Sequence, residues 1–296
     1  MKLMMFAKGT GTALGLVENN GVVDLAAADA SLPRDLEGVM RGGARALAAV
    51  KAAAADVPAT ARLALESVRP ALPVAPTAKI ICVGLNYALH AKEGGHAIPT
   101  YPSFFLRVFS SLLPAGAAVV RPAASAQLDY ECELAIVIGS GGRHIPQAAA
   151  LDHVFGYTLF NDVSVRDFQR KSSQWTAGKN FDASGPLGPW VVTADELPPG
   201  ASGLRITTRV NGEIMQDSNT SDMIFSTERI IALLSEFMTL EPGDVIATGT
   251  PSGVAHARKP PTWLRAGDKV EVAVEGIGVL ANPIVDETPT PASASG

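Results

Sequence analysis

The pattern of apolar and polar residues predicts a chain built mainly of β-strands. Apolar runs of strand length recur along its whole extent, most clearly at residues 3–7, 12–17, 22–25, 79–84, 205–210, 245–249, 269–274 and 279–283. The longer helical patterns are at residues 41–54 and in a stretch that begins after Ser226, an N-cap residue, and runs to about residue 238. The pattern therefore predicts an α+β protein that is mainly β.

A proline-rich stretch at residues 70–76 divides the chain into two parts. The part before it, residues 1–72, is expected to form a small N-terminal α+β domain in which no chemistry is visible. Residues 73–286 are expected to form the larger second domain. Residues 287–296 have the composition of a disordered tail.

Composition narrows the classes of partner. The chain has 296 residues, of which 47% are hydrophobic, and a formal net charge of -5 without a run of basic residues. We therefore expect a small-molecule partner, and neither a nucleic-acid surface nor a membrane span. The two cysteines, Cys82 and Cys132, lie within apolar runs, as reduced thiols of a core do. This cysteine usage favours a cytoplasmic protein.

The segment Leu128–Gly139 joins an acidic half to an apolar half. The second half is a β-branched run typical of a buried strand, while Asp129, Glu131 and Glu133 occupy alternate positions in the first half. Alternate residues point to the same side of a strand, so these carboxylates repel one another unless a cation lies among them. A divalent cation is one explanation, and a sheet-edge strand with its acidic end in solvent is the other.

A second strand, through Phe160, delivers another carboxylate. Asp162, Arg166 and Gln169 follow at positions i, i+4 and i+7, a helical spacing that predicts one common face. Asp162 would then be a third ligand of the cation, with Arg166 and Gln169 as donors to an anionic substrate. The alternative is a plain ion pair between Arg166 and Asp162. Three carboxylates without His or Cys favour Mg²⁺, Mn²⁺ or Ca²⁺ over zinc.

His90 and Glu93 are three residues apart in a segment predicted to form a short helical turn. A carboxylate beside an imidazole raises its basicity and fixes its orientation, as a general base that activates water requires. An ordinary surface ion pair is the alternative. Gly84, Gly94 and Gly95 flank the segment and suggest a lid that closes over a site.

Two further polar residues lie in predicted loops. Lys179 stands between turn-prone segments, where a lysine is usually solvated. Thr250 begins a tight loop whose hydroxyl and backbone N–H groups are suited to hold a carboxylate. Neither residue identifies a site by itself.

Five separated motifs follow one another along the chain: Asn86-Tyr87-x-x-His90-x-x-Glu93, Glu131-x-Glu133, Asp162-Val163-Ser164-x-Arg166-Asp167-x-Gln169, Gly178-Lys179-x-Phe181-Asp182-x-x-x-Pro186-x-Gly188-Pro189 and Thr248-Gly249-Thr250-Pro251-x-Gly253-Val254. Together they resemble the fumarylacetoacetate hydrolase family, over about residues 70 to 286. So many motifs in one order over so long a stretch do not arise by chance.

The resemblance implies a role for most of the residues singled out above. The implied metal ligands are Glu131, Glu133 and Asp162. The implied catalytic residues are His90, Glu93 and Lys179. The implied substrate-binding donors are Arg166, Gln169 and Thr250.

Two residues near these motifs need separate mention. Arg107 occupies a position where relatives commonly have lysine, so a planar guanidinium replaces a point charge. We expect it to bind substrate and to suit a different acid group. Asp129, which strand periodicity places on the face of Glu131 and Glu133, is not a ligand in the family.

The resemblance also implies a mixed, roll-like β-sheet fold for the second domain, a homodimer, and Mg²⁺ or Mn²⁺ as the metal. The expected activity is hydrolysis of a C–C bond in a β-diketo acid of the acylpyruvate or fumarylpyruvate type, giving a 2-oxo acid and a carboxylic acid. Oxaloacetate decarboxylation and isomerisation of an unsaturated 2-oxo diacid are alternatives within the family. A catalytically inactive small-molecule-binding protein is a more distant alternative.

Overall fold

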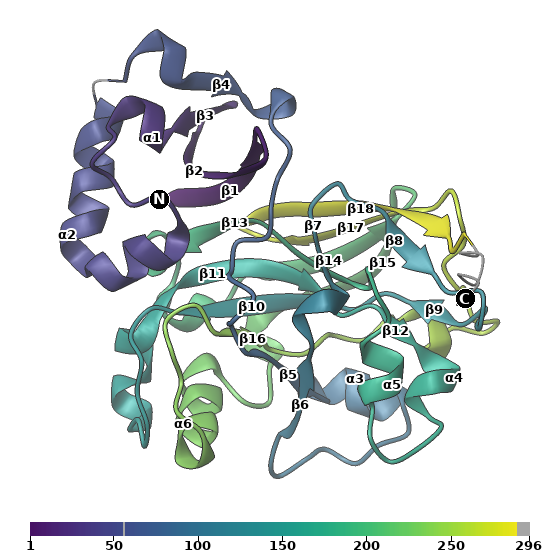
Figure 1. The fold of residues 1–296 in the computed structure, drawn as a ribbon. Helices are drawn as coiled ribbons and strands as arrows, with labels where there is room; N and C mark the ends of the chain where they lie inside the picture. Colours follow the sequence, from purple (N-terminus) through teal and green to yellow (C-terminus); the bar gives the residue numbers. More distant parts are fainter. Residues whose placement is uncertain (56, 289–296) are drawn as a thin grey trace, which may run out of the picture.

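The structure, a computed structural model, describes residues 1–55 and 57–288. A mixed eleven-stranded sheet runs through the molecule in the order β4 (Arg62–Ala64), β3 (Gly21–Asp24), β2 (Gly11–Glu18), β1 (Lys2–Lys8), β13 (Gly185–Thr193), β11 (Val154–Asn161), β10 (Cys132–Ile138), β16 (Val245–Ala247), β5 (Ile80–Gly84) and β6 (Ser103–Arg107), with β7 (Leu112–Pro114) beside β13 (Figure 1). The predicted α+β fold that is mainly β is confirmed.

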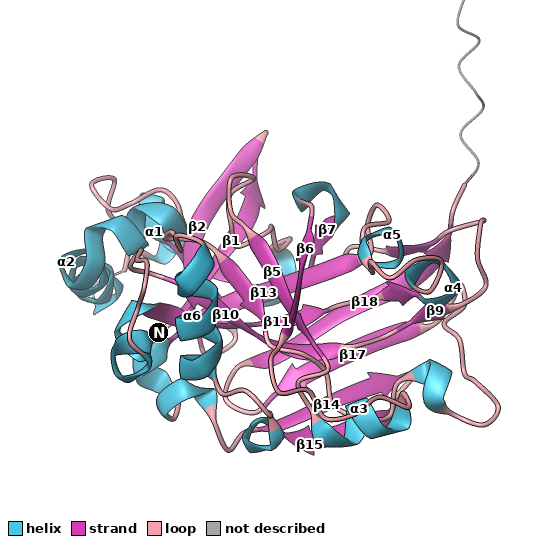
Figure 2. Ribbon diagram, turned by 90° about the horizontal axis from the view of Figure 1, so that it is seen from below, coloured by secondary structure: helices cyan, strands magenta, loops and turns pink. Residues whose placement is uncertain are grey.

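A second sheet covers one face of the first. Its five strands are β15 (Glu213–Asn219), β14 (Arg205–Val210), β17 (Lys269–Val274), β18 (Gly278–Asp286) and β8 (Val119–Arg121). The α-helices lie around the sheets (Figure 2): α1 (Leu25–Ala28), α2 (Leu36–Ala55), α3 (Ala88–Glu93), α4 (Arg166–Gln169), α5 (Thr176–Lys179) and α6 (Thr227–Phe237). None of the helices in the described part of the chain has the length and hydrophobicity needed to span a bilayer.

The N-terminal part protrudes from the larger part but shares its sheet (Figure 1). Strand β1 pairs antiparallel with β13, with Lys2 opposite Val192, so β1 to β4 extend the large sheet. Helix α2 begins five residues earlier than the predicted position 41, and its backbone is not helical at Gly43, where φ is 55°. The domain boundary at residues 72 and 73 falls in the proline-rich connection and stays a prediction.

Strand β10 lies in the middle of the large sheet, between β11 and β16, and all of its residues are buried. Successive side chains of β10 pack on opposite faces of the sheet. Leu134 and Ile136 pack towards the second sheet, whereas Ala135 and Val137 pack on the opposite face. Glu133 has the parity of Ala135 and therefore faces away from the second sheet. The carboxylate of Glu133 is thus on the side of the sheet that faces α3, α4 and α5.

The predicted continuous strand through residues 128–139 is interrupted. Strand β9 (Leu128–Asp129) pairs with β12 (Ser164–Val165), and β10 begins only at Cys132 and pairs with β11. The chain changes sheet at Tyr130 and Glu131. The expectation that residues 129, 131 and 133 share one face by simple alternation is therefore wrong, because alternation does not continue across such a break.

Of the predicted tail, residues 289–296 lie outside the described residues. The predicted hairpin is present, with β14 and β15 joined at Asn211 and Gly212, and helix α6 has Ser226 as its N-cap, whose hydroxyl accepts from the backbone N–H of Arg229. Both predicted elements are therefore present in the structure.

Candidate active site

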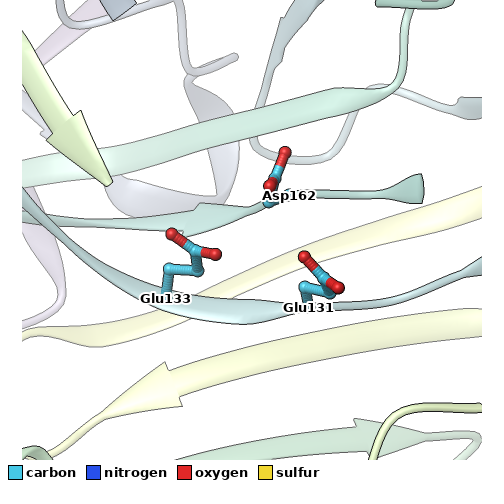
Figure 3. A group of neighbouring side chains, drawn as sticks. All are labelled: Glu131, Glu133 and Asp162. Carbon is cyan, nitrogen blue, oxygen red and sulfur yellow. The ribbon is translucent and has the colours of Figure 1, made fainter. Parts of the chain in front are cut away.

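Three carboxylates meet at the open side of the central strands. Glu133 is in β10, Glu131 lies just before that strand, and Asp162 follows the neighbouring strand β11. Figure 3 shows the three side chains directed towards one another. Each offers an oxygen within 4.8 Å of the others, and all three residues are buried. The three ligands implied by the family motifs therefore converge.

Cationic side chains surround this group. Lys179, from α5, donates to Glu131 Oε2 at 2.6 Å and to Asp162 Oδ2 at 2.5 Å. Arg166, from α4, places its Nη2 at 2.6 Å from Glu131 Oε1, an ion-pair contact that is not aligned as a hydrogen bond. Local sequence predicts a solvated side chain for Lys179, but in the structure this residue is only 2% exposed. Local sequence cannot reveal this, because the partners of Lys179 come from other strands.

These cations give the carboxylates different acidities. Burial raises the pKa of Glu133 well above its usual range, and the neighbouring charges of Asp162 and Glu131 raise it further. Burial opposes ionisation of Glu131 too, but Arg166 and Lys179 outweigh it and hold its pKa below the usual range. The pKa values of Glu131 and Glu133 therefore shift in opposite directions, because the cations compensate the charge of Glu131.

Arg107 lies behind Asp162 and outside the cavity wall. Its Nη1 donates to Asp162 Oδ1 at 2.5 Å, and its other nitrogens donate to Ser111 and Ser184. Its side chain has no exposed surface. We expected Arg107 to bind substrate, but the structure places it outside the cavity. The guanidinium instead fixes the orientation of a carboxylate of the triad.

Asp129 is also directed away from the triad. Its fully buried carboxylate accepts from Arg166 Nε at 2.8 Å and from the backbone N–H groups of Ala255 and His256 at 2.7 and 3.0 Å. Burial alone would raise the pKa of Asp129, but Arg166 and His256 outweigh it and hold it below the usual range. Arg166 therefore bridges Asp129 and Glu131, and the plain ion pair between Arg166 and Asp162 is not formed.

The helical spacing predicted for Asp162, Arg166 and Gln169 does not extend to Asp162. Asp162 precedes β12, and helix α4 begins only at Arg166, so Asp162 and Arg166 do not share a helix face. Within α4, Arg166 Nη1 donates to Gln169 Oε1 at 3.0 Å. Because this hydrogen bond occupies the carbonyl oxygen of Gln169, its amide nitrogen is the group that can donate to other partners.

The predicted pair of His90 and Glu93 is formed in α3. His90 Nδ1 lies 2.9 Å from Glu93 Oε1, and Glu93 also accepts from the backbone N–H of Gly253 at 2.9 Å. The His90 residue is 8% exposed and lines the same cavity as the triad. The pair is therefore part of the site and not a solvated surface contact.

Thr250 also lines the cavity, and a residue that sequence analysis did not single out holds it. Gln216 Nε2 donates to Thr250 Oγ1 at 2.8 Å and to the carbonyl of Pro251, while its Oε1 accepts from the N–H of Cys132. Gln216 thus ties the loop after β16 to the start of β10. No motif reveals this residue, because its partners lie in segments far from it in sequence.

The cavity has a volume of about 450 Å³. Besides the predicted residues, its wall contains several that sequence analysis did not single out: Leu85, His96, Phe105, Arg170, Trp175 and His256. A Cβ added at Gly84 would lie 2.2 Å from Trp175 Cζ3, so this glycine permits close packing of the indole. The lid proposed from the glycines stays a prediction.

The chemistry of the donors suits a hard divalent cation. Three carboxylates from three positions leave open ligand sites, as an ion that also binds substrate requires. Glu131, Glu133 and Asp162 would hold Mg²⁺ or Mn²⁺, with Ca²⁺ as an alternative. Fold and site together define a β-roll protein with a buried carboxylate triad suited to a divalent cation.

Comparison with known proteins identifies the family. Residues 79–285 match the family described as fumarylacetoacetate (FAA) hydrolase C-terminal. Human mitochondrial oxaloacetate tautomerase FAHD2A is 42% identical over 292 residues, covering 96% of this chain and 92% of the relative. The chain belongs to the fumarylacetoacetate hydrolase family, as the motifs led us to expect.

Two solved structures have the same fold over almost the whole chain. A putative HpcE protein from Mycobacterium smegmatis superposes with a TM-score of 0.85 at 34% identity, covering 97% of this chain and all of that one. Maleylpyruvate hydrolase from Sphingobium sp. SYK-6, in complex with manganese(II) and pyruvate, superposes with a TM-score of 0.80 at 30% identity and the same coverage. The chain is therefore an enzyme of this family whose relatives act on keto acids.

Proposed function

We propose that the chain catalyses the keto–enol tautomerisation of a 2-oxo dicarboxylic acid, with oxaloacetate as the first candidate. The observation that carries the proposal is the meeting, in one cavity, of a carboxylate triad, the cations Lys179 and Arg166, and His90, whose Nδ1 is paired with Glu93. Relatives about 42% identical over 96% of the chain are named oxaloacetate tautomerases, which supports this reaction over the hydrolysis expected first.

The proposed metal is Mg²⁺ or Mn²⁺. When bound, it would act as a Lewis acid that stabilises negative charge on the 2-oxo oxygen. Lys179 and Arg166 balance the charge of the carboxylates, so that the site is not repulsive to an anionic substrate. The manganese complex of a structural relative supports the same choice of ion.

Arg166 and Gln169 are the proposed donors to the substrate. Both line the cavity, and the Gln169 carbonyl oxygen is occupied by Arg166, which turns the amide N–H groups outward. A guanidinium beside an amide matches the planar geometry of a carboxylate. Thr250, held by Gln216, adds a hydroxyl on another part of the wall.

His90 is the proposed base. Glu93 holds Nδ1, so the free nitrogen is Nε2, which takes part in no hydrogen bond within the described chain. Proton transfer from C3 of the substrate to its 2-oxo oxygen needs such a group. His90→Ala should lower kcat by about 10²-fold or more with a smaller change in KM.

The experiment follows the enol of oxaloacetate by its ultraviolet absorbance, with Mg²⁺ or Mn²⁺ present. We expect the wild-type chain to accelerate the approach to keto–enol equilibrium without consuming oxaloacetate, and EDTA to abolish the effect. Loss of oxaloacetate with release of CO₂ would instead identify a decarboxylase. An unchanged rate of equilibration in the presence of metal would exclude the proposed function.

Hydrolysis of an acylpyruvate remains the second candidate. The His90–Glu93 pair suits the activation of water, with Lys179 and Gln169 stabilising the developing oxyanion, and a structural relative is a maleylpyruvate hydrolase. Incubation of acylpyruvates in ¹⁸O-water distinguishes this reaction, since a hydrolase places the label in the released carboxylic acid. A chain that binds 2-oxo acids but converts none of them would be the inactive binding protein.

A further inference from the structure

His256 is a cavity residue to which neither the motifs nor the proposed function assigns a role. It lies in a single 3-10 turn, Ala255–Ala257, at the end of the loop that begins with Thr250. Its side chain is 14% exposed, and it lines the same cavity as His90 and the three carboxylates. The cavity wall therefore carries the imidazole of His256 in addition to those of His90 and His96.

The ring of His256 is held in a defined orientation. Its Nδ1 lies 3.3 Å from Oδ2 of Asp129, and its backbone N–H donates to the same oxygen at 3.0 Å. Asp129 is fully buried and also accepts from Arg166 and Ala255. Because Nδ1 faces this buried carboxylate, the accessible edge of the ring carries Nε2. No group in the described part of the chain forms a hydrogen bond with that nitrogen.

His90 has the same arrangement. Its Nδ1 lies 2.9 Å from Glu93, and Glu93 accepts from the N–H of Gly253, in the loop that carries His256. Each imidazole is therefore paired through Nδ1 with a carboxylate that also binds a backbone N–H group of one loop. A carboxylate partner fixes the tautomer and leaves Nε2 as the nitrogen that exchanges protons with a ligand.

We propose that His256 is a second acid–base residue, which divides with His90 the two proton transfers of the proposed tautomerisation. One histidine takes the proton as the C3–H bond breaks, and the bonding pair forms the C2–C3 double bond. The C2–O pair moves onto the oxygen, which takes a proton from the other histidine in its protonated form. The first histidine then releases its proton to water and the second regains one from water, which restores both imidazoles. Protons and electrons balance without an oxidant or a further reactant.

The variant that tests this assignment is His256→Asn. The asparagine amide nitrogen lies close to the position of Nδ1 and retains a donor to Asp129, whereas the group at Nε2 is lost. We expect kcat for oxaloacetate tautomerisation to fall about 10²-fold or more, with KM within about twofold of wild type. The melting temperature should not change. His153→Gln is the matched control, because His153 is held through Nδ1 by the carbonyl of Ser140 outside the cavity, and its activity should equal wild type.

A wild-type kcat in His256→Asn would overturn the assignment, and so would a raised KM with unchanged kcat, which would make His256 a binding donor. Should wild type fail to tautomerise oxaloacetate, the proposed function falls, and the same variants are compared by proton NMR of hydrogen–deuterium exchange at C3 of pyruvate in D₂O. Slower exchange in His256→Asn than in wild type then supports the acid–base role. Equal exchange, or none in wild type, overturns it.

Discussion

Glu131 and Glu133 are two residues apart, yet their surroundings give them opposite acidities. Glu131 lies against Lys179 and Arg166, which lower its pKa. Among the described residues, Glu133 accepts only from the N–H of Gly249, at 2.8 Å, and burial raises its pKa. A bound divalent cation would supply the positive charge that Glu133 lacks. The residue-scale question is therefore whether the triad binds metal.

Metal binding should stabilise the folded chain. A metal that binds only the native state adds RT ln(1 + [M]/Kd), or about 2.7 kcal/mol when free metal is a hundredfold above Kd. We expect Mg²⁺ or Mn²⁺ to raise the melting temperature of the chelated protein, and Zn²⁺ to be a poor substitute. Glu131→Gln should abolish the rise, because it removes a ligand. A thermal-shift titration measures this.

The control for this titration is Glu271→Gln, which changes a carboxylate of β17 outside the cavity and should retain the full metal-dependent rise. A rise in Glu131→Gln equal to that of wild type would mean that the metal binds elsewhere. If metal does not raise the melting temperature of wild type, the three carboxylates do not form a metal site.

At the scale of elements, the site depends on the parallel pair of β5 and β16, which brings the segment of His90 beside the loop of Thr250. Asp244 holds the start of this pair: its buried carboxylate accepts from the backbone N–H of Lys79 at 2.9 Å and lies 2.8 Å from Lys79 Nζ. Burial alone would lower the pKa of Lys79, but Asp244 and Glu241 outweigh it and raise it above 10.5.

This pair predicts a pH dependence of stability. Because the pKa of Lys79 is higher in the folded state, its contribution is fully present below the unfolded value of 10.5 and is lost as pH rises through the folded value. Lys79→Met should lower the free energy of unfolding by about 0.5–1 kcal/mol at pH 8, since the side chain is partly exposed. The difference from wild type should shrink above pH 10.5. Urea unfolding at several pH values checks this.

Lys269→Met is the corresponding control, because Lys269 pairs with Glu271 at a side chain that is 60% exposed. It should change the free energy of unfolding little at any of these pH values. A difference between wild type and Lys79→Met that persists unchanged at the highest pH would mean that lost packing of the lysine stem, and not its charge, accounts for the effect.

At the scale of the whole molecule, we propose that the chain forms a homodimer, as the family resemblance implies. Strand β6 is an edge of the large sheet. Leu106 in this strand is exposed, as are Tyr101 and Val108 on either side of it. An edge strand with exposed apolar residues favours association with another chain. Sedimentation velocity should give twice the chain mass of 30.7 kDa, and Leu106→Asp should shift the mass towards the monomer.

The matched control is Val279→Asp, a similarly exposed apolar residue in β18 of the second sheet, which should leave the mass unchanged. A monomeric wild type at micromolar concentration would contradict the proposal. The cytoplasmic location expected from composition also stays a prediction, and several relatives are named as mitochondrial.

Sequence alone determined the family and many of the elements. Strand-length apolar runs predicted most of the sheet, and short-range pairs such as His90 with Glu93 followed from helical spacing, because these features depend on neighbours in the chain. The ligand types at positions 131, 133 and 162 likewise pointed to a hard divalent cation. The motifs placed these residues in one family before any contact was known.

Only the tertiary structure decided which charges meet. The break at Tyr130 and Glu131 turns Asp129 towards Arg166 and His256, Arg107 is buried behind Asp162, and Lys179 lies among the carboxylates. Each of these contacts joins segments far apart in sequence, and no local periodicity encodes them. Their energies depend on burial and on the partners that the sheets bring together, so the same residue types carry a different chemistry in the fold than in the sequence.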